Sequence, residues 1–258
     1  MENTLLPGDF IVVNKFAYNF STPKEIPFVN IHVPYENLFE IGKPRKNDLI
    51  VFEFPGGFES DPLRNGSKYV KRIVAGPHDT LQIINKEIFV NNLKVNLPNT
   101  LRKTENKQRG GWIKDNIIYP PSADWNRDNY GPIVIPAKGD TIKITPENFK
   151  LCQSVIVMDY GERSFLEEGT LITLNGRAIN EYVLTQDHYF VLGDNLDVSM
   201  DSRQFGFITD NMIVGKALFV YWSFDSEKVA PGPLDFFLQS EQTGFSKELN
   251  NKLRIMEK

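Results

Sequence analysis

The sequence predicts a mainly β protein whose core is built from antiparallel strands. Its 258 residues include 16 prolines and 18 glycines, which separate many short alternating apolar runs of strand length. A second observation is a recurring phrase, in which a turn residue and an aspartate precede such a run. The phrase occurs at Gly8-Asp9, Asn47-Asp48, His78-Asp79 and Gly139-Asp140. Aspartate at a turn binds nearby backbone groups, so each phrase predicts a strand that begins directly after it.

Two further dipeptides predict tight hairpins. Asn91-Asn92 and Asn175-Gly176 each lie between two short apolar runs. Both dipeptides tolerate the positive φ angles that a two-residue hairpin turn requires. We therefore expect a pair of antiparallel strands around each of them.

Changes in composition divide the chain into a core, an insertion and a tail. A basic stretch with Gly-Gly and Pro-Pro pairs follows residue 96, and we interpret it as a solvated loop rather than a nucleic-acid patch. We expect a discontinuous catalytic β core over 1–96 and 181–224, a smaller inserted β domain over 97–180, and a C-terminal tail over 225–258. The end of the tail suits either a short helix or a partly ordered surface segment.

Composition also argues against several classes of protein and site. The 29 basic and 33 acidic residues give a net charge of −4, whereas a dedicated nucleic-acid binder usually has a basic domain. With Cys152 as its one cysteine, the chain lacks the material for an internal disulfide or a Cys-rich zinc site. We expect neither a metal nor an organic cofactor. No apolar run approaches the ~18 residues of a membrane span and no signal peptide is visible, so we expect the 258-residue chain to be soluble.

A lysine within an apolar strand is the first candidate for chemistry. Alternate residues of a strand over 67–74 share one face, which places Lys71 between Tyr69 and Ile73 and turns Arg72 to the opposite side. Apolar neighbours disfavour the charged amine and lower its pKa, and a neutral lysine can act as a general base. The alternative, which is the commoner case for a lone lysine, is an ammonium that reaches water from a half-buried strand.

A polar loop is the second candidate. Residues 193–195 supply a turn after a predicted strand over 189–192. If the chain is extended from Ser199 to Arg203, the side chains of Ser199, Asp201 and Arg203 point to one side. Asp201 and Arg203 can then pair and stiffen the loop, and Ser199 can offer its hydroxyl to a neighbouring group. The alternative is a capped loop with a surface ion pair.

Three segments occur in a fixed order along the chain: MENTLLPGDFIVVNK at 1–15, YVKRIVAGPHD at 69–79 and GDNLDVSMDSRQFG at 193–206. Together they resemble the sequence motifs of bacterial type I signal peptidases, which are membrane-bound Ser–Lys endopeptidases. The resemblance continues in NMIVGKA and FVYWSF near residue 220, and it covers about 1–95 and 185–224.

This resemblance implies a fold, a reaction and a location. The fold is a mostly antiparallel β structure with an inserted, more variable β domain. The reaction is hydrolysis of the peptide bond after a secretory signal peptide, with small residues in the A-x-A pattern before the cut. The implied partners are signal-peptide segments of secretory pre-proteins and the membrane, with no nucleic acid. The implied location is the bacterial cytoplasmic membrane, with the catalytic domain on its outer side.

The resemblance also implies roles for individual residues. Lys71 matches the general base, and Ser199 matches the serine whose hydroxyl orients that lysine. Asp201 and Arg203 match the ion pair that supports the site. The positions that match the apolar substrate pockets are Met1, Leu5, Tyr69 and Val70 for the residue before the cut, and Ile11 near the second pocket.

The sequence departs from the family pattern at a few positions. The family's nucleophilic serine directly precedes the position of Met1, and its second oxyanion donor and membrane anchor also lie upstream. We therefore expect this chain to be inactive as given. Asn3, His78 and Leu196 stand where the family often has Pro, Gly and Arg, which changes local geometry but leaves the base and its orienting serine in place.

Two alternative functions remain open. One is a degenerate, non-catalytic paralogue that begins at Met1 and only binds extended peptides, although such a protein has no need of a desolvated lysine. The other is a self-cleaving repressor-type Ser–Lys protease of the same general fold. Repressors of that type carry an N-terminal DNA-binding helical region, and this sequence has neither that region nor a basic balance of charge.

Overall fold

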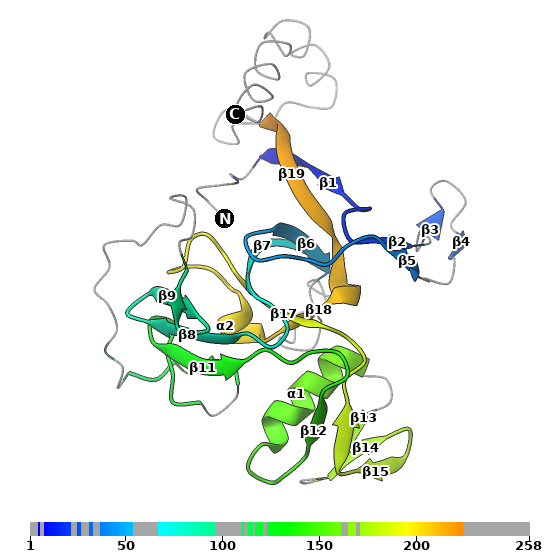
Figure 1. Cartoon of the computed structure of the whole chain (residues 1–258), viewed down its shortest axis with the longest axis vertical. Helices are drawn as coiled ribbons and strands as arrows, with labels where there is room; N and C mark the ends of the chain where they lie inside the picture. The colour runs from blue at the N-terminus through cyan, green and yellow to red at the C-terminus, as the bar shows by residue number, and fades with distance from the viewer. Residues whose placement is uncertain are drawn as a thin grey trace, which may run out of the picture.

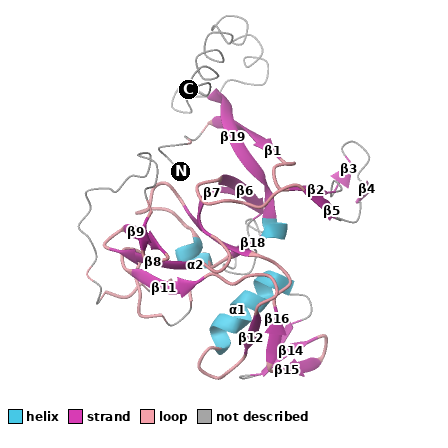
Figure 2. Ribbon diagram, viewed as in Figure 1, coloured by secondary structure: helices cyan, strands magenta, loops and turns pink. Residues whose placement is uncertain are grey.

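Antiparallel strands supply most of the regular structure (Figure 2). The structure, a computed structural model, describes residues 5, 8–21, 25–26, 31–32, 37–53, 67–95, 110, 113–115, 117–120, 123–160, 165–168 and 171–223. Every strand pair within these ranges is antiparallel. The predicted mainly β class is therefore confirmed. The predicted tail over 225–258 lies outside the described residues.

A six-stranded sheet forms the framework of the molecule (Figure 1). Its strands, in spatial order, are β1 (Asp9–Asn14), β19 (Ile213–Ser223), β6 (Leu49–Glu53), β7 (Lys68–Ala75), β17 (His188–Leu192) and β18 (Ile208–Thr209). The middle strand β7 pairs with β6 on one side and with β17 on the other. Because β7 is central, a side chain on either of its faces can be shielded from water by neighbouring strands and loops.

A four-stranded sheet lies beside this framework. It contains β10 (Leu93–Lys94), β9 (Glu87–Val90), β8 (Thr80–Ile84) and β11 (Tyr130–Val134), in that spatial order. The strand β11 comes from the predicted insertion and pairs with β8 from the predicted core. The boundaries of the predicted domains themselves remain a prediction.

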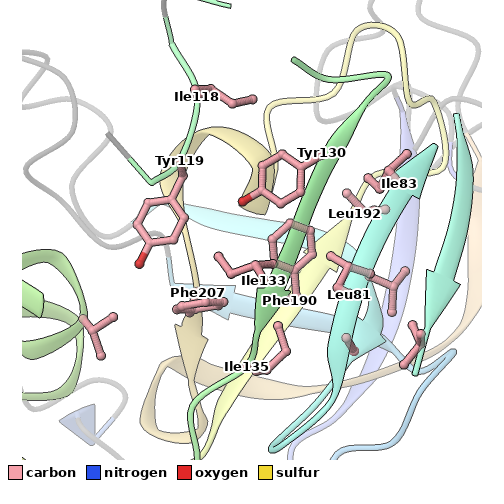
Figure 3. Close-up of a cluster of buried hydrophobic side chains, with 14 of the residues drawn as sticks. Leu81, Ile83, Ile118, Tyr119, Tyr130, Ile133, Ile135, Phe190, Leu192 and Phe207 are labelled. Carbon is pink, nitrogen blue, oxygen red and sulfur yellow. The ribbon is translucent and has the colours of Figure 1, made fainter. Parts of the chain in front are cut away.

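Strand β17 joins the two apolar clusters of the core because both of its faces are buried. Phe190 and Leu192 pack with Leu81, Tyr130 and other residues of the four-stranded sheet, as Figure 3 shows. The alternating residues of the same strand, Tyr189 and Val191, belong to a second cluster with side chains from β6, β7 and β18. This period-two alternation is what a strand buried on both faces requires.

Smaller elements complete the described fold. The helices are α1 (Phe149–Tyr160), the short α2 (Ser202–Phe205) and a single 3₁₀ turn over Asp210–Met212. The remaining strands are β2 (Asn19–Ser21), β3 (Glu25–Ile26), β4 (Ile31–His32), β5 (Asn37–Glu40), β12 (Thr141–Lys143), β13 (Phe165–Glu168), β14 (Leu171–Leu174), β15 (Arg177–Ile179) and β16 (Glu181–Val183). Among the described helices, none has the length and apolar character needed to span a membrane.

The four turn phrases behave as the sequence predicts. The residue before each aspartate has a positive φ, which is 95° at Gly8, 73° at Asn47, 63° at His78 and 90° at Gly139. Strands β1, β6, β8 and β12 follow directly. In three of the phrases the aspartate carboxylate accepts the backbone N–H of the residue three positions earlier, at 2.9–3.0 Å. This bond closes the turn and fixes where the strand begins.

Within the described ranges, three tight hairpins have two residues in the left-handed region. Those at Asn91-Asn92, with φ of 53° and 64°, and at Asn175-Gly176, with φ of 50° and 74°, confirm the predicted turns. The third, between β8 and β9, was not predicted. Its residues Asn85 and Lys86 have φ of 50° and 67°, and lysine gives no sequence signal for this conformation.

Candidate active site

The side chain of Lys71 is buried at the centre of the six-stranded sheet. Lys71 is 8% exposed, and its backbone lies opposite that of Ile50 in the register of β6 and β7. The Nζ atom donates a hydrogen bond to Oγ of Ser199 at 3.2 Å. Ile73 on the same face is fully buried, as the strand pattern predicts. The alternative of a lysine that reaches water is therefore wrong for this residue.

Burial lowers the pKa of the Lys71 amine, because few water molecules can solvate its charge. The carboxylate of Asp201 acts in the opposite direction, and the guanidinium of Arg203 offsets it. Asp194 adds a smaller contribution that raises the pKa, and the net direction is downward. The amine is thus biased toward the neutral form that can accept a proton.

Ser199, itself buried, is held against Lys71 by a loop over 193–201. This loop leaves β17 and enters α2, and the backbone N–H of Ser199 donates to the carbonyl of Asn195 at 3.1 Å. Gly193 lies directly against the serine. A Cβ atom at Gly193 would lie 2.1 Å from Ser199 Oγ and 2.7 Å from Ser199 Cβ. Only glycine therefore fits beneath Ser199, which sequence reasoning missed because it took Gly193 as a turn residue alone.

Asp201 and Arg203 form the predicted pair, and both residues are almost completely buried. The guanidinium donates from Nε to Oδ1 and from Nη2 to Oδ2 of Asp201, each at 2.8 Å. The alternative of a surface ion pair is therefore wrong. The pair also binds the loop at two points, since Gly193 N–H donates to Asp201 Oδ2 at 3.3 Å and Arg203 Nη2 donates to the Leu196 carbonyl at 2.7 Å.

The predicted extended path from Ser199 to Arg203 is wrong. Asp201 is the N-cap of α2, with extended backbone angles of its own, and Arg203 lies inside the helical turn. The Asp201 side chain accepts the backbone N–H of Arg203 at 3.3 Å. An aspartate N-cap satisfies the free N–H groups at a helix start, which favours the turn over a continuous strand. The two side chains meet because the Arg203 guanidinium turns back toward Asp201, the residue that caps the start of the helix containing Arg203.

A second buried ion pair lies on the opposite side of β7 and was not predicted. Arg72 donates from Nε and Nη2 to the two carboxylate oxygens of Asp194, at 3.0 and 2.8 Å. Its Nη1 donates to the carbonyl of Asn47 at 3.0 Å. As expected, the Arg72 side chain faces away from Lys71. Its ion pair holds Asp194, the residue that directly follows Gly193. Breaking a buried pair of this kind by removing one partner costs about 3–5 kcal/mol.

The predicted substrate-pocket residues lie in three places. Tyr69 and Val70 are half-buried on β7 directly before Lys71, and the Tyr69 ring centroid lies 6.3 Å from that of Phe52. Ile11 lies on the edge strand β1, with β19 and β6 between it and β7. Leu5 is half-buried, and Met1 lies outside the described residues. The pocket assignments for these residues remain a prediction.

The arrangement of Lys71 and Ser199 suits proton transfer. In the neutral form, an amine that donates one hydrogen to Ser199 keeps its lone pair free for a hydroxyl that approaches from another direction. The described residues contain no cluster of three or more His, Cys, Asp or Glu side chains that could hold a metal ion.

Comparison with known proteins gives a consistent set of matches. The family described as "Signal peptidase, peptidase S26" matches residues 1–222. Signal peptidase I from Haemophilus influenzae is 29% identical over 246 residues, which cover 88% of this chain and 62% of that protein. Signal peptidase I from Buchnera aphidicola subsp. Baizongia pistaciae is 27% identical over 229 residues, covering 86% of this chain and 66% of that protein. Signal peptidase I from Aquifex aeolicus is 26% identical over 237 residues, covering 90% and 75%.

The chain spans about two thirds of the length of the curated relatives that it matches. Among solved structures, the crystal structure of a signal peptidase I from Enterococcus faecalis is 18% identical in sequence. The superposition covers 68% of this chain and 97% of that one, with a TM-score of 0.34.

Proposed function

The chain belongs to the signal peptidase S26 family, and we propose that it is the catalytic domain of a serine endopeptidase that removes signal peptides from secreted pre-proteins. The family is the one that the three sequence motifs predict, so that prediction is confirmed. We place the reaction at the outer side of the bacterial cytoplasmic membrane, with the peptide cut after small residues in the A-x-A pattern.

The observation that carries this proposal is the buried hydrogen bond between Lys71 Nζ and Ser199 Oγ. Neutral Lys71 takes the proton of the attacking serine hydroxyl as its oxygen adds to the scissile carbonyl. The lysine then gives that proton to the departing amine, and the acyl group stays on the serine. Water, deprotonated by the same lysine, releases the acyl group and restores the free hydroxyl. Ser199 fixes the direction of the amine throughout and forms no covalent bond.

We propose that the attacking hydroxyl belongs to a serine placed directly before Met1, as the alignment of the first motif implies. The base and the attacking hydroxyl must lie within about 2.6–3.2 Å of each other in a competent complex. Ser199 already fills one such position beside Lys71, and its Oγ lies beneath the loop against Gly193. Met1, Leu5, Tyr69 and Val70 would then line the pocket for the residue before the cut, with Ile11 near the second pocket.

Adding that serine should create activity. We expect residues 1–258 alone to leave an A-x-A signal peptide uncut in detergent, and a chain extended upstream to end in Ser directly before Met1 to cut it. The matched control is the same extension ending in Ala. Equal turnover by the short and the Ser-extended chains would mean that the nucleophile lies within 1–258. Binding without cleavage by the Ser-extended chain would instead support the non-catalytic, peptide-binding paralogue.

Ser199 should orient the base without attacking the substrate. In the Ser-extended chain, Ser199→Ala is expected to slow cleavage by a factor on the order of 10²–10⁴, the usual contribution of a positioned acid–base group. A serine-directed covalent inhibitor should label the added serine and leave Ser199 unmodified, as read by mass spectrometry of the peptides. An adduct on Ser199 would contradict this role.

A further inference from the structure

A third ion pair, also largely shielded from water, lies on the loop that carries Ser199, and the mechanism above does not use it. We refer to Lys71 and Ser199, which are joined by the hydrogen bond described above, as the dyad. Lys86, at the tip of the β8–β9 hairpin, is 5% exposed. Its Nζ lies 2.6 Å from Oδ1 of Asp197, whose side chain is 12% exposed. Lys86 also has a φ of 67°, which lysine rarely adopts. A buried charge and a strained backbone each cost free energy, so other interactions must stabilise the hairpin tip in this geometry.

Asp197 belongs to the loop that carries Ser199, two residues before it. Other contacts hold the loop at Gly193, Asp194 and Leu196, all of which precede Asp197. The Lys86–Asp197 and Arg203–Asp201 ion pairs lie on either side of Ser199, each attached two residues from it along the chain. Because the Ser199 N–H bonds to the carbonyl of Asn195 within the same loop, a shift of Asp197 would move the serine with it.

The hairpin tip is itself rigidly supported. The backbone N–H of Lys86 donates to the carbonyl of Asp128 at 2.9 Å, and the N–H of Asn85 donates to Oδ1 of Asn129 at 3.1 Å. The turn over 126–129 is closed by the buried side chain of Asn126, whose Oδ1 accepts two backbone N–H groups at 2.9 Å. Arg203 also donates from Nη1 to the carbonyl of Arg127 at 3.1 Å. One turn thus supports both Lys86 and Arg203.

We propose that Lys86 is a positioning residue that sets the distance between Ser199 and Lys71 by holding Asp197. The four-stranded sheet thereby fixes the geometry of the dyad from outside the strand that carries the base. This inference rests on the proposed roles of Lys71 and Ser199.

The first test follows the titration of Lys71 by NMR in the 258-residue chain with isotope-labelled lysine. In the double variant Lys86→Met/Asp197→Asn, we expect the pKa of Lys71 to rise, because a loosened loop admits water to the amine. Removing both charges together avoids leaving either member of this ion pair as the lone charge of the pair. Lys94→Met, which breaks an exposed ion pair with Glu87 across the adjoining β9–β10 hairpin, is the matched control and should leave the pKa of Lys71 unchanged.

The second test measures cleavage by the Ser-extended chain. The double variant should lower kcat roughly tenfold with little change in KM, part of the roughly 10²–10⁴ that the positioned group contributes. In a Ser199→Ala background the same change should cost nothing further, whereas a general loss of stability would cost the same in both backgrounds. Lys86→Arg keeps the cation and should retain most of the activity.

These results separate the inference from the proposed function. If the Ser-extended chain cuts no peptide, the proposed function fails, yet the titration of Lys71 still decides whether Lys86 positions the dyad. An unchanged Lys71 pKa in the folded double variant overturns the inference, and so does an equal loss of kcat in the Ser199→Ala background. If the double variant does not fold, Lys86→Gln is titrated in its place, and an unchanged Lys71 pKa there also overturns it.

Discussion

Replacing Lys71 with alanine in the Ser-extended chain should reduce cleavage of a signal peptide to background while the protein stays folded. The loss should reach the upper end of the roughly 10²–10⁴ that a general base contributes, since no other described side chain is hydrogen-bonded to Ser199 Oγ. Lys71→Arg should fail as well, because a guanidinium does not lose its proton in the working pH range. Burial lowers the pKa of Lys71, so the parent activity should rise with pH as this amine loses its proton.

The matched control for this prediction is Lys68→Ala. Lys68 lies on the same strand, three residues before Lys71, and its side chain is exposed. Initial rates on one A-x-A peptide, with circular dichroism to confirm folding, make the comparison. Turnover by Lys71→Ala close to that of the parent would exclude Lys71 as the base.

Gly193→Ala should cause a loss of similar size although neither Lys71 nor Ser199 is substituted. The added Cβ would lie 2.1 Å from Ser199 Oγ, 2.7 Å from Ser199 Cβ and 3.4 Å from Lys71 Nζ. Ser199 must move to make room, which breaks its hydrogen bond to the lysine. We expect kcat to fall by about 10²–10⁴, as on removal of the orienting hydroxyl itself.

Gly76→Ala tests whether such a loss is specific to the site. Gly76 directly follows β7, and a Cβ there would lie 3.6 and 3.7 Å from atoms of the Tyr189 ring, which is ordinary contact. This variant should fold and cleave like the parent. If Gly193→Ala were as active as Gly76→Ala, the close packing beneath Ser199 would have no bearing on catalysis.

Local chemistry explains the part of the fold that the sequence predicts. Each turn phrase has a left-handed residue before its aspartate, and in three of the four the aspartate carboxylate closes the turn. The four strands follow as expected. The order of strands in the sheets has no such local signal. Strand β19 pairs with β1 and β6, so Ser223 lies opposite Asp9 and Lys216 opposite Ile50, and no short sequence pattern links segments this far apart.

The candidate site likewise has a part that short sequence patterns predict and a part that they do not. Lys71, Ser199, Asp201 and Arg203 belong to motifs short enough to be recognised, and the structure brings their side chains together. The ion pairs Arg72–Asp194 and Lys86–Asp197 join segments more than a hundred residues apart, so no short sequence pattern predicts them. The extended path predicted through Asp201 was wrong because an aspartate before a helix and one within a strand look alike in a short segment.

The account depends on a lysine that is neutral under working conditions, so the titration of Lys71 tests it most directly. The side-chain resonances of isotope-labelled lysines in the 258-residue chain are followed by NMR as the pH is raised, and Lys71→Arg identifies the signal that belongs to Lys71. The account predicts that this signal titrates at a lower pH than is usual for a lysine exposed to water, because burial disfavours its charge. A Lys71 signal that titrates together with the exposed lysines would contradict it.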